Sequence, residues 1–154
     1  MITWDKIVKA VAGAAGAVWG LFGGRDTMLT VMLALMAIDY VTGLVIGWIG
    51  KSPKTDSGHL SSSVGWAGLA KKAGELLAVV VGVLLDMLAV EQLGLQAAMF
   101  RTGMILYIVA TEGISVLENL GILGVPLPGF VVKALEQLRD RSDAGEKKEV
   151  TRGR

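Results

Sequence analysis

The sequence predicts an all-α integral membrane protein with about four transmembrane helices. The main observation is the stretch Met28–Ile49, which has 22 residues and a single ionisable side chain, Asp39. At about 1.5 Å of rise per residue, such a helix is about 33 Å long and crosses a hydrocarbon core of about 30 Å. The second observation is that only 19% of the chain is charged and 53% is hydrophobic, whereas soluble proteins carry about 25% charged residues.

Two more stretches, at about 73–90 and 97–117, are apolar enough to span a bilayer. The fourth predicted span, at about 4–22, is dominated by small residues. A helix that lies in the membrane surface is an alternative for this segment and would leave three spans. A cleaved signal peptide is a further alternative, because basic residues precede the apolar part.

The polar segments complete the expected organisation. Lys51–Ala70 contains a proline, a serine run and several glycines, so we expect a loop there. The transmembrane domain would then occupy 1–128, followed by an amphipathic helix over 129–141 and a disordered polar tail over 142–154.

Small residues recur at helical spacing in two of the predicted spans. Ala12, Gly16 and Gly20 are each four residues apart, and so are Gly43 and Gly47. Because small side chains let two helix backbones approach closely in a bilayer, these positions are candidates for helix packing.

Basic residues beside the spans predict the topology. The N-terminus carries Lys6 and Lys9, the loop at 51–70 and the two lysines after it are basic, and seven basic residues follow Pro128. Since cytoplasmic segments are enriched in Lys and Arg, four spans with both termini in the cytoplasm fit this pattern. If the first helix lies flat, three spans remain and the N-terminus faces out or lies in the outer headgroups. This places Lys6 and Lys9 on the disfavoured side, so four spans are preferred.

Four ionisable residues within the predicted spans are candidates for pore lining or helix pairing: Asp39, Asp86, Arg101 and Glu112. Asp86 and Arg101 fall toward the same face on consecutive helices, so they are expected to form an ion pair. Asp39 lies near mid-depth without a basic residue at the same depth. A protonated carboxyl group, a hydrated interior or a neighbouring subunit would each accommodate it. A purely structural role for these charges is the alternative.

Enzymatic chemistry is not expected. The sequence offers no nucleophile and base pair, no phosphate-binding loop and no cluster at metal-ligand spacing, so we expect no catalytic residue, cofactor or metal. It contains no cysteine, and its one histidine, His59, lies in the predicted loop. No basic face interleaved with aromatics suggests a nucleic-acid partner.

Several blocks of the chain, over about residues 28–140, are similar to the toxin-secretion/phage-lysis holin family. The matching residues in order are Asp39-Tyr40-Val41-Thr42-Gly43, Ser62, Gly65, Gly68, Lys71-Lys72, Leu85-Asp86, Glu112-Gly113, Ser115, Glu118-Asn119, Gly121, Gly124, Pro126 and Pro128. The resemblance implies a phage-encoded protein of the bacterial cytoplasmic membrane. Such a protein oligomerises into lesions that release an endolysin or a toxin and trigger host lysis, without direct contact with the endolysin. The resemblance supplies no catalytic residues.

Two other functions are compatible with the same residues. One is a small oligomeric ion channel or transporter subunit in which Asp39 binds a proton or cation. The other is an antiholin, which would be inert alone and would delay the action of another holin.

Overall fold

The computed structural model describes residues 3–95, 99–134 and 137. Their secondary structure is helical, as predicted. The four helices are α1 (Trp4–Leu21), α2 (Thr27–Trp48), α3 (Ser62–Leu93) and α4 (Met99–Ile122). Of the predicted helix at 129–141, residues 129–134 are helical. Most of the remainder, and the predicted tail at 142–154, lie outside the described residues.

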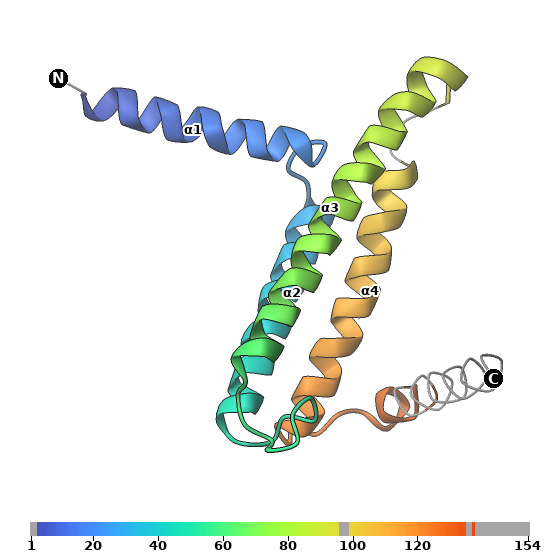
Figure 1. The fold of residues 1–154 in the computed structure, drawn as a ribbon. Coiled ribbons are helices and arrows are strands. Elements are labelled where there is room, and N and C mark those ends of the chain that lie inside the picture. Colours follow the sequence, from blue (N-terminus) through green and yellow to red (C-terminus); the bar gives the residue numbers. More distant parts are fainter. Residues whose placement is uncertain (1–2, 96–98, 135–136, 138–154) are drawn as a thin grey trace, which may run out of the picture.

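Helices α2, α3 and α4 form an elongated up-down-up bundle in which α4 packs against both of the others (Figure 1). The core of the bundle is narrow, and large apolar side chains project outward along all three helices. The buried core consists of Leu29, Met32, Met36, Val79, Ile105 and Ile108. A bundle with an apolar exterior is the arrangement expected where lipid, not water, surrounds the helices.

Three of the described helices, α2, α3 and α4, are long and apolar enough to cross a membrane. The fourth predicted span is not confirmed. α1 has 18 residues, and only its part from Ala12 to Leu21 is continuously apolar. The all-α membrane fold is therefore confirmed, whereas the number of spans supported by length and composition is three.

The predicted loop at Lys51–Ala70 is too long, because α3 already begins at Ser62. The glycines that suggested a loop are tolerated within the helix. A Cβ atom at Gly65 would contact nothing within 4 Å, and one at Gly68 would come no closer than 3.9 Å to Tyr40. About three further turns of helix therefore place Lys72 inside the bundle and not at its edge.

The helix also extends beyond the end of the predicted span at about 97–117, since α4 continues to Ile122. Asn119 explains why the helix continues. Its side-chain amide donates to the carboxylate of Asp39 at 3.0 Å and to the hydroxyl of Thr42 at 2.9 Å. These contacts give the polar end of α4 a partner on α2.

α1 leaves the bundle through a tight turn and extends away from it (Figure 1). Gly23 and Gly24 form this turn with φ angles of 74° and 96°, a backbone conformation that glycine adopts without steric cost.

Among the described residues, the small residues predicted to pack helices do not contact another helix. Ala12 is exposed, and a Cβ atom at Gly16, Gly20 or Gly43 would meet nothing within 4 Å. Gly47 faces Leu60 of the loop instead. Their use between copies of the chain stays a prediction.

Candidate functional site

The most unusual feature of the bundle is a buried ionic cluster to which each of its three helices contributes. Asp39 comes from α2, Lys72 from α3 and Glu112 from α4. The ammonium group of Lys72 donates to Asp39 Oδ2 at 2.8 Å and also to Glu112 Oε2. The side chain of Glu112 is fully buried and that of Lys72 is 11% exposed. The cluster therefore connects all three helices through one lysine.

Two more charged residues on α3 extend this cluster. The ammonium group of Lys71 lies 3.3 Å from Glu112 Oε1 and 3.2 Å from Glu75 Oε1. The other oxygen of Glu75, Oε2, is buried and has no hydrogen-bond partner among the described residues. With Asp39 and Lys72 included, three carboxyl groups share two ammonium groups, so one negative charge is left unbalanced if all five are ionised.

The cluster lies close to the middle of the spans. Asp39 is the thirteenth of the 22 residues of α2, so about 18 Å of helix separates it from the start of α2. An unpaired charge at such a depth costs several kcal/mol, and this cost falls when an opposite charge and further hydrogen bonds are supplied. The bundle supplies Asp39 with both the opposite charge and the further hydrogen bonds.

The prediction that Asp39 has no basic partner at its depth is therefore wrong. It assumed that Lys72 lies at the boundary between loop and membrane. Because α3 begins at Ser62, Lys72 lies about 15 Å from the start of the helix. This places Lys72 at the same depth as Asp39.

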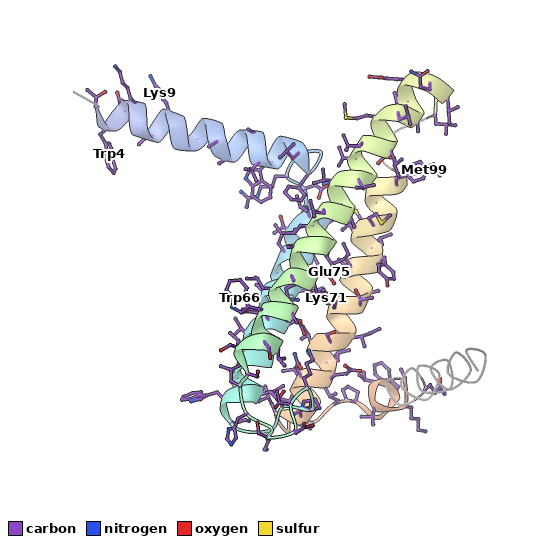
Figure 2. The ribbon with its side chains drawn as sticks, viewed as in Figure 1. Trp4, Lys9, Trp66, Lys71, Glu75 and Met99 are labelled. Atoms are coloured by element: carbon purple, nitrogen blue, oxygen red, sulfur yellow. The ribbon has the colours of Figure 1, made fainter. Side chains whose placement is uncertain are left out.

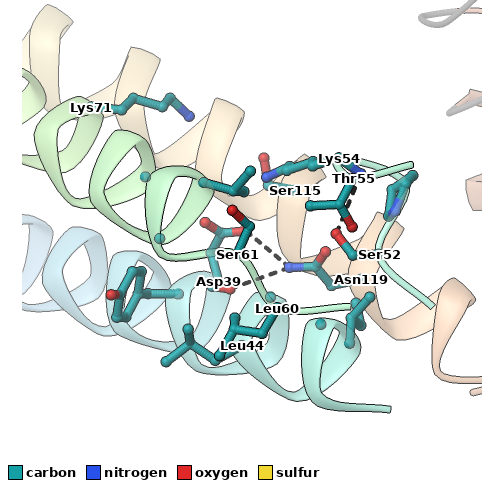
Figure 3. A pocket seen from close by; sticks show the side chains of 18 of the residues that line it. Asp39, Leu44, Ser52, Lys54, Thr55, Leu60, Ser61, Lys71, Ser115 and Asn119 are labelled. Carbon is teal, nitrogen blue, oxygen red and sulfur yellow. Dashed lines mark hydrogen bonds between the residues drawn. The ribbon is translucent and has the colours of Figure 1, made fainter. Parts of the chain in front are cut away.

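A pocket of about 120 Å³, lined by both polar and apolar side chains, opens beside the cluster (Figure 3). It runs from Asp39 and Asn119 toward the loop between α2 and α3. Its polar lining includes Ser52, Lys54, Thr55, His59, Ser61, Lys71 and Ser115. A pocket of this volume with polar groups in its lining holds several water molecules. The loop end of the bundle therefore gives a hydrated approach to the buried charges.

Asp86 and Arg101 meet at the opposite end of the bundle, but not as the predicted ion pair. The carboxylate of Asp86 accepts hydrogen bonds from the backbone N–H groups of Phe100 and Arg101, both at 2.9 Å. These N–H groups belong to the first turn of α4 and have no partner within their own helix. Asp86 therefore caps α4 from a neighbouring helix.

The guanidinium group of Arg101 points toward the turn before α2. It donates to Asp26 Oδ2 and to the carbonyl oxygen of Phe22, each at 2.6 Å, and to the carbonyl oxygen of Gly24 at 3.2 Å. Asp26 also accepts from the backbone N–H of Leu29 and so caps α2. The hydrogen bond from Arg101 and that from Leu29 hold the pKa of Asp26 below its usual value.

Sequence reasoning missed Gly82, which allows α3 and α4 to approach each other at this end. A Cβ atom at Gly82 would lie 2.9 Å from the Cα atom of Arg101, a backbone atom that cannot rotate away. Gly82 lies one helical turn before Asp86, on the same face of α3. The spacing Gly82-x-x-x-Asp86, a small residue one turn before an acidic one, is the sequence signal that could have indicated this close approach.

An apolar three-helix bundle that encloses paired charges defines a multi-pass helical membrane protein. Comparison with known proteins then identifies its family, because residues 16–140 match the bacteriophage holin family. The chain belongs to this family.

The relatives come from bacteria and from a phage. An uncharacterized protein of Clostridium perfringens is 37% identical over 80% of this chain and 83% of its own length. An uncharacterized protein of Halalkalibacterium halodurans is 31% identical over 90% of this chain and 94% of its own length. A protein of Bacillus phage phi105 named "Probable holin" is 29% identical over 82% and 84%. No solved structure matches the chain.

Proposed function

We propose that this chain is a holin that oligomerises in the bacterial cytoplasmic membrane and opens lesions through which an endolysin, or a toxin, reaches the cell wall. The observation that carries the proposal is the match to the holin family over most of the chain, together with its phage relative. Host lysis then follows from the endolysin and not from any catalysis by this chain.

The buried cluster gives this function a physical basis. In the single subunit, Asp39, Lys72 and Glu112 satisfy one another, and the outside of the bundle is apolar. Such a subunit can accumulate in lipid with these three charges covered. A water-filled lesion needs a polar lining. A rearrangement that separates α3 from α2 and α4 would expose Asp39, Lys72 and Glu112, and these residues would form such a lining.

The proposed orientation follows the basic residues. Lys51 and Lys54 lie in the loop between α2 and α3, and Lys133 follows α4 at the same end of the bundle. The positive-inside rule supports a cytoplasmic position for this end. A cytoplasmic N-terminus, in contrast, requires α1 to span the membrane.

The alternatives make different predictions for the same cluster. A continuously working channel would use Asp39 as a cation or proton site. The hydrogen bonds of Asp39 to Lys72 and Asn119 occupy both of its carboxylate oxygens in this conformation. An antiholin would need only the bundle and a partner holin.

Controlled expression tests the proposal. The chain is induced in bacteria with and without a co-expressed endolysin, while a dye reports the membrane potential. We expect an abrupt loss of potential and growth arrest in both cultures, with lysis only where endolysin is present. A graded, pH-dependent flux without an abrupt onset would support the channel. Continued growth at high levels of membrane-inserted protein would contradict a holin and leave the antiholin.

A further inference from the structure

α1 has two chemically different faces. At 100° per residue, Trp4, Val8, Ala15 and Val18 fall on one side of the helix. The opposite side carries Lys6, Lys9, Gly13, Gly16 and Gly20. The side chains of the first face are not covered by the bundle, with Trp4 77% and Val18 52% exposed.

The apolar face of α1 is turned toward the side on which the bundle lies. Figure 2 shows Trp4 on the side of α1 that faces along the bundle, and Lys9 on the side that faces away from it. If the bundle spans a bilayer, this orientation directs Trp4 into lipid and Lys9 into water. Tryptophan is enriched at the membrane interface for this reason.

The junction between α1 and α2 holds α1 at the end of the membrane span. α1 ends just before Arg25 and Asp26, where α2 begins. The guanidinium group of Arg101 binds the carbonyl oxygens of the turn. Trp19 and Phe22 pack against the buried core. The direction of α1 is therefore set by several contacts and not by a free linker.

A transmembrane α1 fits these observations less well. Its lysines and glycines share one face, so a spanning helix would need a partner for that face. Within the chain, a Cβ atom at Gly13, Gly16 or Gly20 would meet nothing within 4 Å. The same face is well suited to water when the helix lies flat.

We propose that α1 is an amphipathic helix lying in the outer leaflet of the cytoplasmic membrane, with its apolar face in the lipid and its Lys/Gly face in water. The outer side follows because α1 leaves the bundle at the end opposite to the lysine-bearing loop between α2 and α3 (Figure 1). The chain then has three spans and an external N-terminus. α1 binds lipid and not another copy of the chain.

Single-cysteine labelling tests this placement directly, because the natural chain contains no cysteine. The variants Val8→Cys and Val18→Cys probe the apolar face, and Gly13→Cys and Gly16→Cys probe the other. Ser57→Cys, exposed in the loop, reports the cytoplasmic side. Spheroplasts are treated with a membrane-impermeant maleimide before any loss of membrane potential, and again after disruption of the membrane.

We expect Gly13→Cys and Gly16→Cys to react in intact spheroplasts at least about tenfold faster than Val8→Cys and Val18→Cys, since a thiol in an apolar environment forms little thiolate. Ser57→Cys should react only after disruption. Protection of all four α1 positions would overturn the proposal and indicate a transmembrane α1. Equal reaction of all four, reaction of the Gly13 and Gly16 variants only after disruption, or a reversed pattern would overturn it as well.

Discussion

At the scale of single residues, the charge balance of the bundle depends on Lys72. It is the lysine that contacts both Asp39 and Glu112, and it is nearly buried. Its neighbour Lys71 contacts Glu112 and Glu75, but its side chain is 57% exposed. Adjacent residues of the same type thus have different environments and form a matched pair for mutagenesis.

Lys72→Met should destabilise the protein by about 3–5 kcal/mol, because it leaves two buried carboxylates without their shared cation. Lys71→Met should cost less, because the side chain of Lys71 is 57% exposed and Glu112 keeps its contact with Lys72. Unfolding of the purified variants in detergent measures both free energies. Equal losses for the two variants would refute the central position of Lys72.

A second substitution separates lost charge pairing from lost packing. Adding Glu112→Gln to Lys72→Met removes one of the two carboxylates that lost Lys72 as a partner, so the double variant should recover part of the lost stability. If Lys72 acted only by filling space, the second change would restore nothing.

Sequence reasoning identified the charged residues that form polar contacts between elements more often than it identified their contact partners. Asp39, Asp86, Arg101 and Glu112 all take part in polar contacts between elements. The partners of Asp39, Asp86 and Arg101 were missed because they depend on depth, and depth depends on where each helix begins. An error of about ten residues in the start of α3 was enough to hide the contact between Lys72 and Asp39.

At the scale of helices, α3 and α4 approach each other closely at Gly82. Gly82 of α3 faces the backbone of Phe100 and Arg101 at the start of α4. Asp86, one turn further along α3, accepts hydrogen bonds from the same two residues. A small residue and a capping carboxylate together bring the two helices close and satisfy the exposed N–H groups.

Gly82→Ala should therefore destabilise the protein by about 1–3 kcal/mol, because the added methyl group has to displace backbone. Gly74→Ala, also within α3, is the matched control. A Cβ atom there meets nothing within 4 Å, so this change should be neutral or stabilise by about 0.5–1 kcal/mol through helix propensity. Thermal unfolding of the two variants should shift in opposite directions. A stabilising effect of Gly82→Ala would contradict the close approach.

The presence of the membrane-spanning helices was easier to predict than the residues at which they begin and end. Long apolar runs identify α2, α3 and α4 because a bilayer demands length and hydropathy whatever the tertiary contacts are. The ends of α3 and α4 depend on contacts between elements, such as that of Asn119 with α2. For α1, small residues raise the apolar content of a helix that carries charges in its first turns, so composition favoured a fourth span that is not confirmed.

At the scale of the whole molecule, the bundle carries apolar side chains on its exterior as well as in its core, and it buries a small group of charges. Its exterior carries large apolar side chains and its centre holds Asp39, Lys72 and Glu112. The pocket beside Asp39 reaches the loop end of the bundle (Figure 3). This distribution suits a subunit that is stable in lipid as a monomer. The buried charged residues would also supply the polar surface of the water-filled opening that we propose between subunits.

Release of cargo from reconstituted vesicles tests the account most directly. Purified chain is inserted into lipid vesicles that contain both a small fluorescent dye and a folded protein of the size of an endolysin, and the escape of each is followed as protein density rises. The account predicts that, above a threshold density, the folded protein escapes together with the dye. Escape of the dye alone at every density, or retention of both, would contradict a lesion-forming holin.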